Sequence, residues 1–356
     1  MYSLSENWKS EGHTLEGFAK LIRGLSQITF AERIPSIAEL DLVWTGDPGK
    51  NHRAYVQGKE YLIRRSNAES YLEIQDEVTD AVMYEKELYF CTRPAITDIG
   101  RLAGIGGTRF CQPCPERTRY LSVKLCDMQV KDTSATLVYR KKGATKLLLG
   151  IRGKSFTLHN MQAAVQAATY LCEKEGFRAE RWEATNVDGV AFIAVKDRMY
   201  VRITDTMSGN ASFTAEAGLR FAPGVYAPLS AHTVEHRGIR EDAPITAVSL
   251  SLKEAKPLAE KALSLENKGI SSMEEQKRLL DAIWKAEGAD SRRDGVVGSF
   301  KKSHDEEIKS IVPPAENRLM LLEAVYSLPA VLDAEMMNSS EGMPQTIKSV
   351  EALLGA

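Results

Sequence analysis

The sequence predicts an α+β protein, with a mixed or antiparallel sheet body and a helical C-terminal part. Strand-like segments separated by turn residues recur between residues 38 and 221. From about Leu252 onward, apolar residues instead repeat at helical spacing. The chain has 356 residues, more than a typical single domain. We therefore expect a body over residues 1–250, with a basic, β-rich segment at 101–160, and a helical region over 251–356.

The first part of the body is expected to begin with a helix and to continue as short strands. Thr14 can cap a helix whose apolar residues recur at helical spacing as far as Leu25. Residues 77–84 are expected to form a short helix, and the glycine-rich stretch 100–107 a loop. The expected strands are 38–44, 55–57, 60–64 and 71–74.

The middle of the chain is expected to be rich in strands, with one helix among them. The turn at residues 141–144 predicts a hairpin between two of the strands. Asn160 can cap a helix over 161–172, and Gly176 stands near its end. The expected strands are 120–125, 135–139, 146–150, 191–195, 199–203 and 218–221.

The C-terminal region is expected to hold several helices. Ser271 and Ser272 stand three residues before Glu274 and Glu275, which is the spacing of a capping box. An amphipathic helix is expected to follow, then a charged linker over 288–304. The remaining expected helices are 315–337, interrupted by Pro329, and 345–354.

Five cysteines favour a reducing compartment. Their number is odd and the chain is long, which argues against a secreted disulfide framework and for the cytoplasm. Cys111 and Cys114 form the one closely spaced pair. A zinc site would need Cys91 and Cys126 as well, and those spacings are unusual for structural zinc. A turn with two reduced thiols is the simpler interpretation.

Residues 232–236 spell H-x-x-E-H, the zinc motif of inverted zincins. In that motif His232 and His236 bind the metal from one helical turn, and Glu235 serves as general base. Pro228 and Gly238 flank the motif and disfavour a helix there. Complete phosphate-binding loops and a nucleophile elbow are also missing from the sequence. We expect a protein without catalytic activity and without a bound cofactor or metal.

The near-neutral net charge of −2 is a sum of opposite regions. Residues 101–160 hold twelve Lys or Arg and three acidic residues, a net charge of +9. The rest of the chain holds 34 basic and 45 acidic residues, a net charge of −11, and residues 61–100 alone carry −4. Such a local excess of positive charge can bind a nucleic-acid backbone.

Three aromatic residues, Tyr120, Tyr139 and Phe156, lie among the basic residues of this segment. A sheet that presents cations to phosphates and rings to bases suits single-stranded nucleic acid. Two alternatives stay open: a solvated face balanced by acidic segments, including across a subunit interface, and a protein-only interface. The expected nucleic-acid contacts are Arg117, Arg119, Tyr139, Arg140, Lys141, Lys142, Lys146, Arg152, Lys154 and Phe156.

Several segments between about residues 160 and 240 share a pattern with known sequences. They are Leu171–Phe177, Ile203–Phe213, and Gly218–Phe221 followed by Glu235–Gly238. In them the chain resembles an uncharacterised family of phage/plasmid-like proteins from prophages and other mobile elements. The family's Ser-His-Asp-Gly core is replaced here by Thr-Met-Ser-Gly. The resemblance implies a mobile-element origin and makes His236 a family-like position rather than a zinc ligand.

Together these patterns predict a phage or mobile-element protein that binds nucleic acid. The expected role is a single-stranded DNA-binding or annealing accessory factor in replication, recombination or transcription. A homo-oligomer is expected, because the basic segment and the acidic remainder can pair between subunits. The alternative is a virion structural or assembly protein whose charge asymmetry makes subunit contacts. No apolar run is long enough for a transmembrane helix, so no membrane partner is expected.

Overall fold

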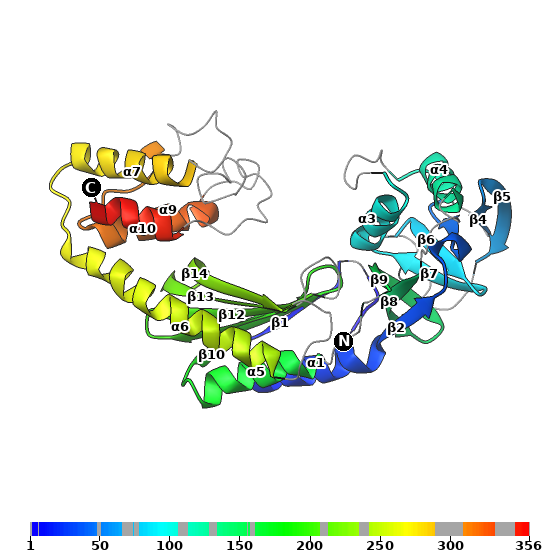
Figure 1. Cartoon of the computed structure of the whole chain (residues 1–356), viewed down its shortest axis with the longest axis horizontal. Coiled ribbons are helices and arrows are strands. Elements are labelled where there is room, and N and C mark those ends of the chain that lie inside the picture. Colours follow the sequence, from blue (N-terminus) through cyan, green and yellow to red (C-terminus); the bar gives the residue numbers. More distant parts are fainter. Residues whose placement is uncertain are drawn as a thin grey trace.

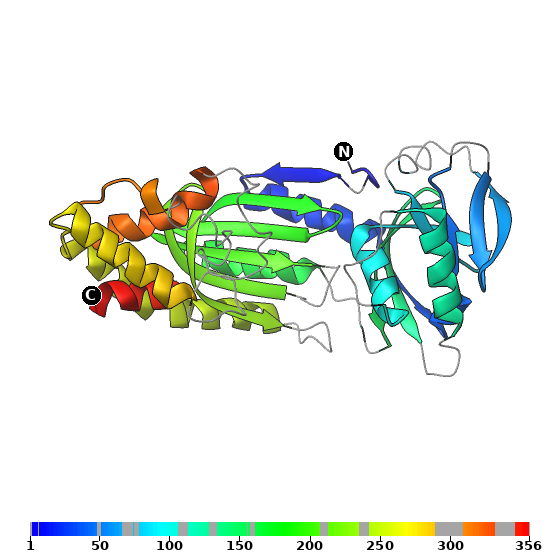
Figure 2. The ribbon, with the colours of Figure 1, turned by 90° about the horizontal axis from the view of Figure 1, so that it is seen from above.

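The computed structural model shows two sheets and a group of C-terminal helices, which confirms the α+β prediction. Along the molecule's long axis, the eight-stranded sheet lies at one end, the six-stranded sheet in the middle and the C-terminal helices at the other end (Figures 1 and 2). The structure describes residues 2–5, 7–47, 51–65, 74, 78–105, 113–127, 134–154, 156, 161–206, 213–234, 242–288, 309–331 and 346–355.

The six-stranded sheet is antiparallel and carries helices on one face. Its strands, in spatial order, are β1 (Lys9–Gly12), β10 (Arg178–Thr185), β11 (Gly189–Lys196), β12 (Met199–Asp205), β13 (Phe213–Ala222) and β14 (Val225–Val234). The helices are α1 (Leu15–Ile28), α5 (Gln162–Glu173) and α6 (Ala243–Leu263). Figure 1 shows these helices below the sheet.

Side-chain alternation explains why one face of this sheet is covered. On β11, Phe192 and Ala194 are buried in the core, whereas Ile193 between them is only partly buried. Successive strand residues point to opposite faces, so the apolar set faces the helices. Helix α1 supplies Phe18 and Ile22 to the same core, and its cap is as predicted: the Thr14 Oγ1 accepts a hydrogen bond from Gly17 N at 3.1 Å.

The eight-stranded sheet is antiparallel except where β7 pairs with β9. Its strands, in spatial order, are β2 (Thr29–Ile34), β8 (Ala135–Lys142), β9 (Thr145–Gly153), β7 (Glu87–Cys91), β6 (Asp80–Tyr84), β3 (Asp41–Trp44), β4 (Asn51–Val56) and β5 (Lys59–Arg64). Helices α3 (Arg93–Leu102) and α4 (Pro115–Cys126) pack on it, and a short 3₁₀ turn, Ile37–Glu39, precedes β3. The predicted hairpin is confirmed as β8 and β9.

The C-terminal part is helical, as predicted. A 3₁₀ turn (Ser264–Asn267) leads from α6 to α7 (Met273–Gly288), α9 (Arg318–Val331) and α10 (Thr346–Gly355). Ser272 Oγ accepts from Glu275 N at 3.1 Å, and the Glu275 carboxylate accepts from Ser271 N at 2.8 Å, which confirms the predicted cap. Among the described helices, none is both long and apolar enough to cross a membrane.

Two predicted elements are wrong, and five strands were missed. Residues 80–84 form the buried strand β6 rather than a helix, because a short apolar run does not distinguish the two by periodicity. Residues 120–125 belong to helix α4, which Pro115 begins at a position that favours proline. The strands that were not predicted are β1, β2, β7, β10 and β14. Helix α6 begins at Ala243, earlier than expected. Residues 71–73 of the predicted strand 71–74 and the linker from residue 289 lie outside the described residues, and Ile74 is helical.

Candidate ligand pocket and the predicted basic site

Three of the predicted nucleic-acid contacts are buried in ion pairs. Arg117 pairs with Asp80 and Lys146 with Glu87, while Arg152 Nη1 lies 3.0 Å from Asp98 Oδ2. These three cations come from the basic segment. Their three partners all come from the acidic segment 61–100. These three of the twelve cations of the basic segment are therefore paired within the eight-stranded sheet and its helices, which we call the eight-stranded lobe.

Three more of the predicted contacts lie in the interior. Arg140 is fully buried, and its Nη1 donates to the Asn186 side chain, which joins β8 to the turn after β10. Burial lowers the pKa of this guanidinium, and the Tyr2 hydroxyl acts in the opposite direction. Tyr139 and Phe156 are also buried, Phe156 in the core beneath the six-stranded sheet. The predicted exposed platform of cations and rings is thus not formed.

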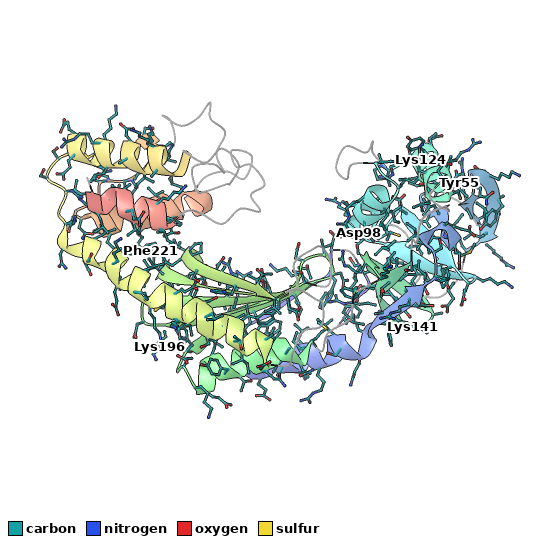
Figure 3. All side chains as sticks on the ribbon, in the orientation of Figure 1. Tyr55, Asp98, Lys124, Lys141, Lys196 and Phe221 are labelled. Atoms are coloured by element: carbon teal, nitrogen blue, oxygen red, sulfur yellow. The ribbon has the colours of Figure 1, made fainter. Side chains whose placement is uncertain are left out.

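The remaining predicted contacts are more exposed but dispersed. Arg119 lies on α4, where its Nε donates to Gly58 O at 3.0 Å. Lys141 and Lys142 stand at the tip of the β8–β9 hairpin, and Lys154 follows the other end of β9. Figure 3 shows Lys141 and the α4 residue Lys124 on opposite sides of the lobe.

The candidate metal ligands do not gather in the described part of the chain. No group of three or more His, Cys, Asp or Glu side chains there could hold a metal ion. His232 lies on strand β14, and its Nε2 is 2.9 Å from the Glu254 Oε2, so the first histidine of H-x-x-E-H lacks the helix that the zinc motif needs. Cys114 is a free thiol just before α4. Cys111, Glu235 and His236 lie outside the described residues.

A pocket of about 800 Å³ lies on the face of the six-stranded sheet that is opposite α1, α5 and α6. We call it the sheet pocket. Its lining residues come from the loop before α1, from β10, β11 and β12, and from the β13–β14 hairpin: His13, Glu180, Arg181, Trp182, Glu183, Thr185, Asp188, Gly189, Val190, Ala191, Ile193, Arg202, Thr204, Pro223, Gly224 and Tyr226.

The sheet curls at one end of the sheet pocket. Glu180 on β10 and Arg220 on β13 are separated by two strands, yet the Arg220 Nε lies 2.8 Å from the Glu180 Oε1. Tyr226 on β14 donates its hydroxyl to the Glu180 Oε2 at 2.7 Å. A β-bulge at Gly218 accompanies the curl, and a Cβ there would lie 2.1 Å from the Ala227 carbonyl oxygen. Gly218 thus allows the close backbone approach.

A second polar group adjoins the first at this end. Tyr200 donates its hydroxyl to the Glu216 Oε1 at 2.5 Å, and the Arg202 Nη1 lies 3.4 Å from the same oxygen. The Arg202 guanidinium also lies 5.4 Å from the centre of the Tyr226 ring, within cation–π range. Burial, followed by the hydrogen bond to Glu180, raises the pKa of Tyr226 to about 12, so this phenol stays protonated at neutral pH.

The floor of the sheet pocket is apolar between two arginines. The strand register places Arg181 opposite Ile193, and Ile193 opposite Arg202. The Arg181 Nη2 donates to the Glu183 Oε2 at 2.7 Å. The pocket therefore combines an aliphatic floor with guanidinium and carboxylate groups that already pair with each other.

Sequence reasoning missed the sheet pocket. The only available signal was local: Arg181 and Glu183, and likewise Arg202 and Thr204, are two residues apart, so each pair lies on one face of its strand. Nothing in the sequence order brings Arg220 and Tyr226 to Glu180, because that contact depends on the curl of the sheet.

Comparison with known proteins identifies no relative of the chain. No protein-family model, no curated protein and no solved structure matches the chain. The geometry of the chain itself is therefore the basis for inferring its function.

Proposed function

We propose that the chain is a binding protein and that its ligand is a small polar molecule held in the sheet pocket. The observation that carries this proposal is a concave site of about 800 Å³ with an aliphatic floor and a few converging polar groups. Sites of this size and composition commonly take small organic ligands. The mutual pairing of the polar side chains keeps them oriented before a ligand arrives.

The charge of the walls favours a small ligand with both donors and acceptors. Arg181 pairs with Glu183, Arg202 with Glu216, and Arg220 with Glu180. These pairs balance, so the site offers no excess of positive charge to hold a polyanion. A molecule with its own hydrogen-bond donors and acceptors can contact both signs of charge without leaving either unpaired.

The arrangement supports binding more than catalysis. The Glu180 carboxylate accepts from Arg220 and Tyr226, and Glu216 accepts from Tyr200 while it pairs with Arg202. A carboxylate acting as general base must be able to reach a proton of the substrate. Both carboxylates are instead engaged by side chains of the protein.

Ligand-observed NMR tests this function with glutamine, guanosine and glucose as probes of three polar classes. We expect at least one probe to bind the wild type and to be lost in Ile193→Trp, which fills the floor of the pocket. Ala231→Trp is the matched control, because Ala231 lies on the same cross-strand row but does not line the pocket. Binding that survives Ile193→Trp, or no binding by any probe, would contradict the proposal.

A second candidate function, nucleic-acid binding, rests on a smaller site than the sequence suggested. Phe30 on β2 is 41% exposed and stacks on Tyr139, with ring centres 5.6 Å apart. Lys141 follows Tyr139 by two residues, on the same face of β8, and is exposed. An exposed ring beside a cation can stack a base and contact a phosphate. Under this proposal the chain acts in the cytoplasm on single-stranded DNA, as a mobile-element accessory factor.

Fluorescence anisotropy with a labelled single-stranded oligonucleotide at two salt concentrations tests the second candidate. We expect binding that weakens with salt and is lost in Phe30→Ala with Lys141→Glu. Lys253→Glu, an exposed lysine on α6, is the control for total charge. No binding at low salt, or equal loss in the control, would contradict it.

A further inference from the structure

Strand β5 ends the eight-stranded sheet, and in the described part of the chain it pairs only with β4. We call its outward side the β5 edge. Leu62, at its centre, is 63% exposed, the largest fraction among the exposed large apolar side chains of the described residues. An exposed edge with an apolar side chain at its centre is a template for pairing with another strand.

The β4–β5 turn decides which residues present their backbone groups to the β5 edge. Gln57 and Gly58 form a two-residue turn, both with positive φ, between the paired residues Val56 and Lys59. Such a turn is closed by a hydrogen-bonded pair, and these pairs alternate along the hairpin. Lys59, Tyr61 and Ile63 therefore direct their N–H and C=O groups to β4. Those of Glu60, Leu62 and Arg64 point outward.

We propose that the β5 edge pairs with the β5 edge of a second copy of this chain, antiparallel and centred on Leu62. In this register Leu62 faces Leu62 of the second copy, and Glu60 faces its Arg64. Every pair then joins residues with outward backbone groups, about 5.5 Å apart at Cα, and exchanges both hydrogen bonds. The strand is complementary to itself in charge as well as in apolar surface.

Charge selects this register over its neighbours. A shift by two residues in either direction also satisfies the backbone, but it removes Glu60 from Arg64 and pairs Leu62 with a charged side chain. The pairing stops at Arg64, because the next residue, Arg65, donates to the Thr45 carbonyl at 3.3 Å and is held against its own subunit.

Helix α4 extends the proposed interface. Leu62 shares its sheet face with Tyr55, which pairs with Glu60 and lies under α4, where the Ser122 Oγ donates to the Tyr55 carbonyl at 2.9 Å. On α4, Tyr120 is 50% exposed and Val123 39%. The twofold axis of an antiparallel pair is perpendicular to the sheet, so both α4 helices flank the two Leu62 side chains on the same face.

Sedimentation equilibrium of the full chain tests the pairing. We expect a dimer for the wild type and a monomer for Glu60→Arg, which places two arginines opposite each other. The double variant Glu60→Arg with Arg64→Glu should recover the dimer, because it restores opposite charges across the interface. Glu85→Arg, an exposed turn residue outside the β5 edge, controls for the charge change.

Cross-linking tests the register independently of the charges. Leu62→Cys should form an intermolecular disulfide on mild oxidation, and Tyr120→Cys, on α4, should do so much less. A monomeric wild type at the highest soluble concentration would overturn the proposal. So would a dimer that persists in Glu60→Arg, or a dimer of the Leu62→Cys variant whose two introduced thiols do not cross-link. Circular dichroism of each variant separates loss of pairing from loss of folding.

Discussion

The Arg152 Nη1 lies 3.0 Å from the Asp98 Oδ2, and both side chains are more than nine-tenths buried. The Asp98 Oδ2 also accepts from Ile151 N at 3.0 Å, so the pair ties helix α3 to strand β9. Burial raises the pKa of the Asp98 carboxyl, although Arg152 acts in the opposite direction. Arg152, which was expected to contact phosphate, therefore holds together the interior of the eight-stranded sheet and its helices.

Removing the Arg152 charge should strongly destabilise the protein. Arg152→Met keeps most of the side-chain volume but leaves Asp98 buried without its main counter-charge, so we expect a loss of about 3–5 kcal/mol in the free energy of unfolding. Urea denaturation followed by circular dichroism measures it. Arg101→Met is the matched control: Arg101 also pairs with Asp98 but is half exposed, so its loss should not exceed about 1 kcal/mol.

Replacing both partners should cost less than replacing Arg152 alone. In Asp98→Asn with Arg152→Met no buried charge is left uncompensated, and the amide oxygen can still accept from Ile151 N. We expect the double variant to be more stable than Arg152→Met. Equal or additive losses would show that the ion pair does not couple these residues.

The sequence shows the number of charged residues in each segment, but it does not show which acidic side chain pairs with which basic one. Asp80, Glu87 and Asp98 precede Arg117, Lys146 and Arg152 by 37, 59 and 54 residues. The parallel pairing of β7 with β9 and the packing of α3 and α4 bring them together. A net charge of +9 in one segment therefore indicates an exposed basic face only when the acidic partners lie elsewhere.

Helix α4 shows a different limit of sequence reasoning. Leu121, Val123 and Leu125 alternate with polar residues and so predict a strand. In the structure Leu121 and Leu125 are buried, one helical turn apart, whereas Val123 is 39% exposed. The helices and strands with longer repeats, including α1, α5, β8 and β9, were predicted correctly, because their patterns fit one period only.

Gly218→Ala should disturb the curled end of the sheet pocket. The new Cβ would lie 2.1 Å from the Ala227 carbonyl oxygen, which is backbone and cannot turn away, so β13 and β14 must separate locally. We expect a loss of about 1–3 kcal/mol in the free energy of unfolding and weaker binding of any pocket ligand. Gly153→Ala, at the end of β9 with open space around it, is the control for the loss of a strand glycine.

Gly24→Ala should stabilise the protein. Gly24 lies within α1, and a Cβ there would meet nothing within 4 Å. Alanine restricts the unfolded chain more than glycine and favours the helix by about 0.5–1 kcal/mol. Thermal and urea unfolding should both shift toward higher stability. A decrease would mean that α1 does not keep this helical geometry in solution.

His52 should make folding stability depend on pH on the acidic side. Its side chain is fully buried on β4, and burial, with the Arg65 guanidinium acting in the same direction, lowers the pKa of the imidazole from 6.5 to about 4. The unfolded chain therefore binds a proton more readily than the folded one. The stability contributed by neutral His52 is fully present above pH 6.5 and is lost as the pH falls toward 4, by at most about 3 kcal/mol.

Urea unfolding near pH 7 and near pH 4.5 measures this dependence. His52→Gln removes the titrating group, so the variant should lose less stability than the wild type between the two pH values, whatever its stability near neutrality. His13→Gln, which removes an exposed imidazole, should retain the wild-type dependence. If His52→Gln and the wild type lose the same amount, the acidic loss of stability arises from other groups, and His52 is accessible to protons in the folded state.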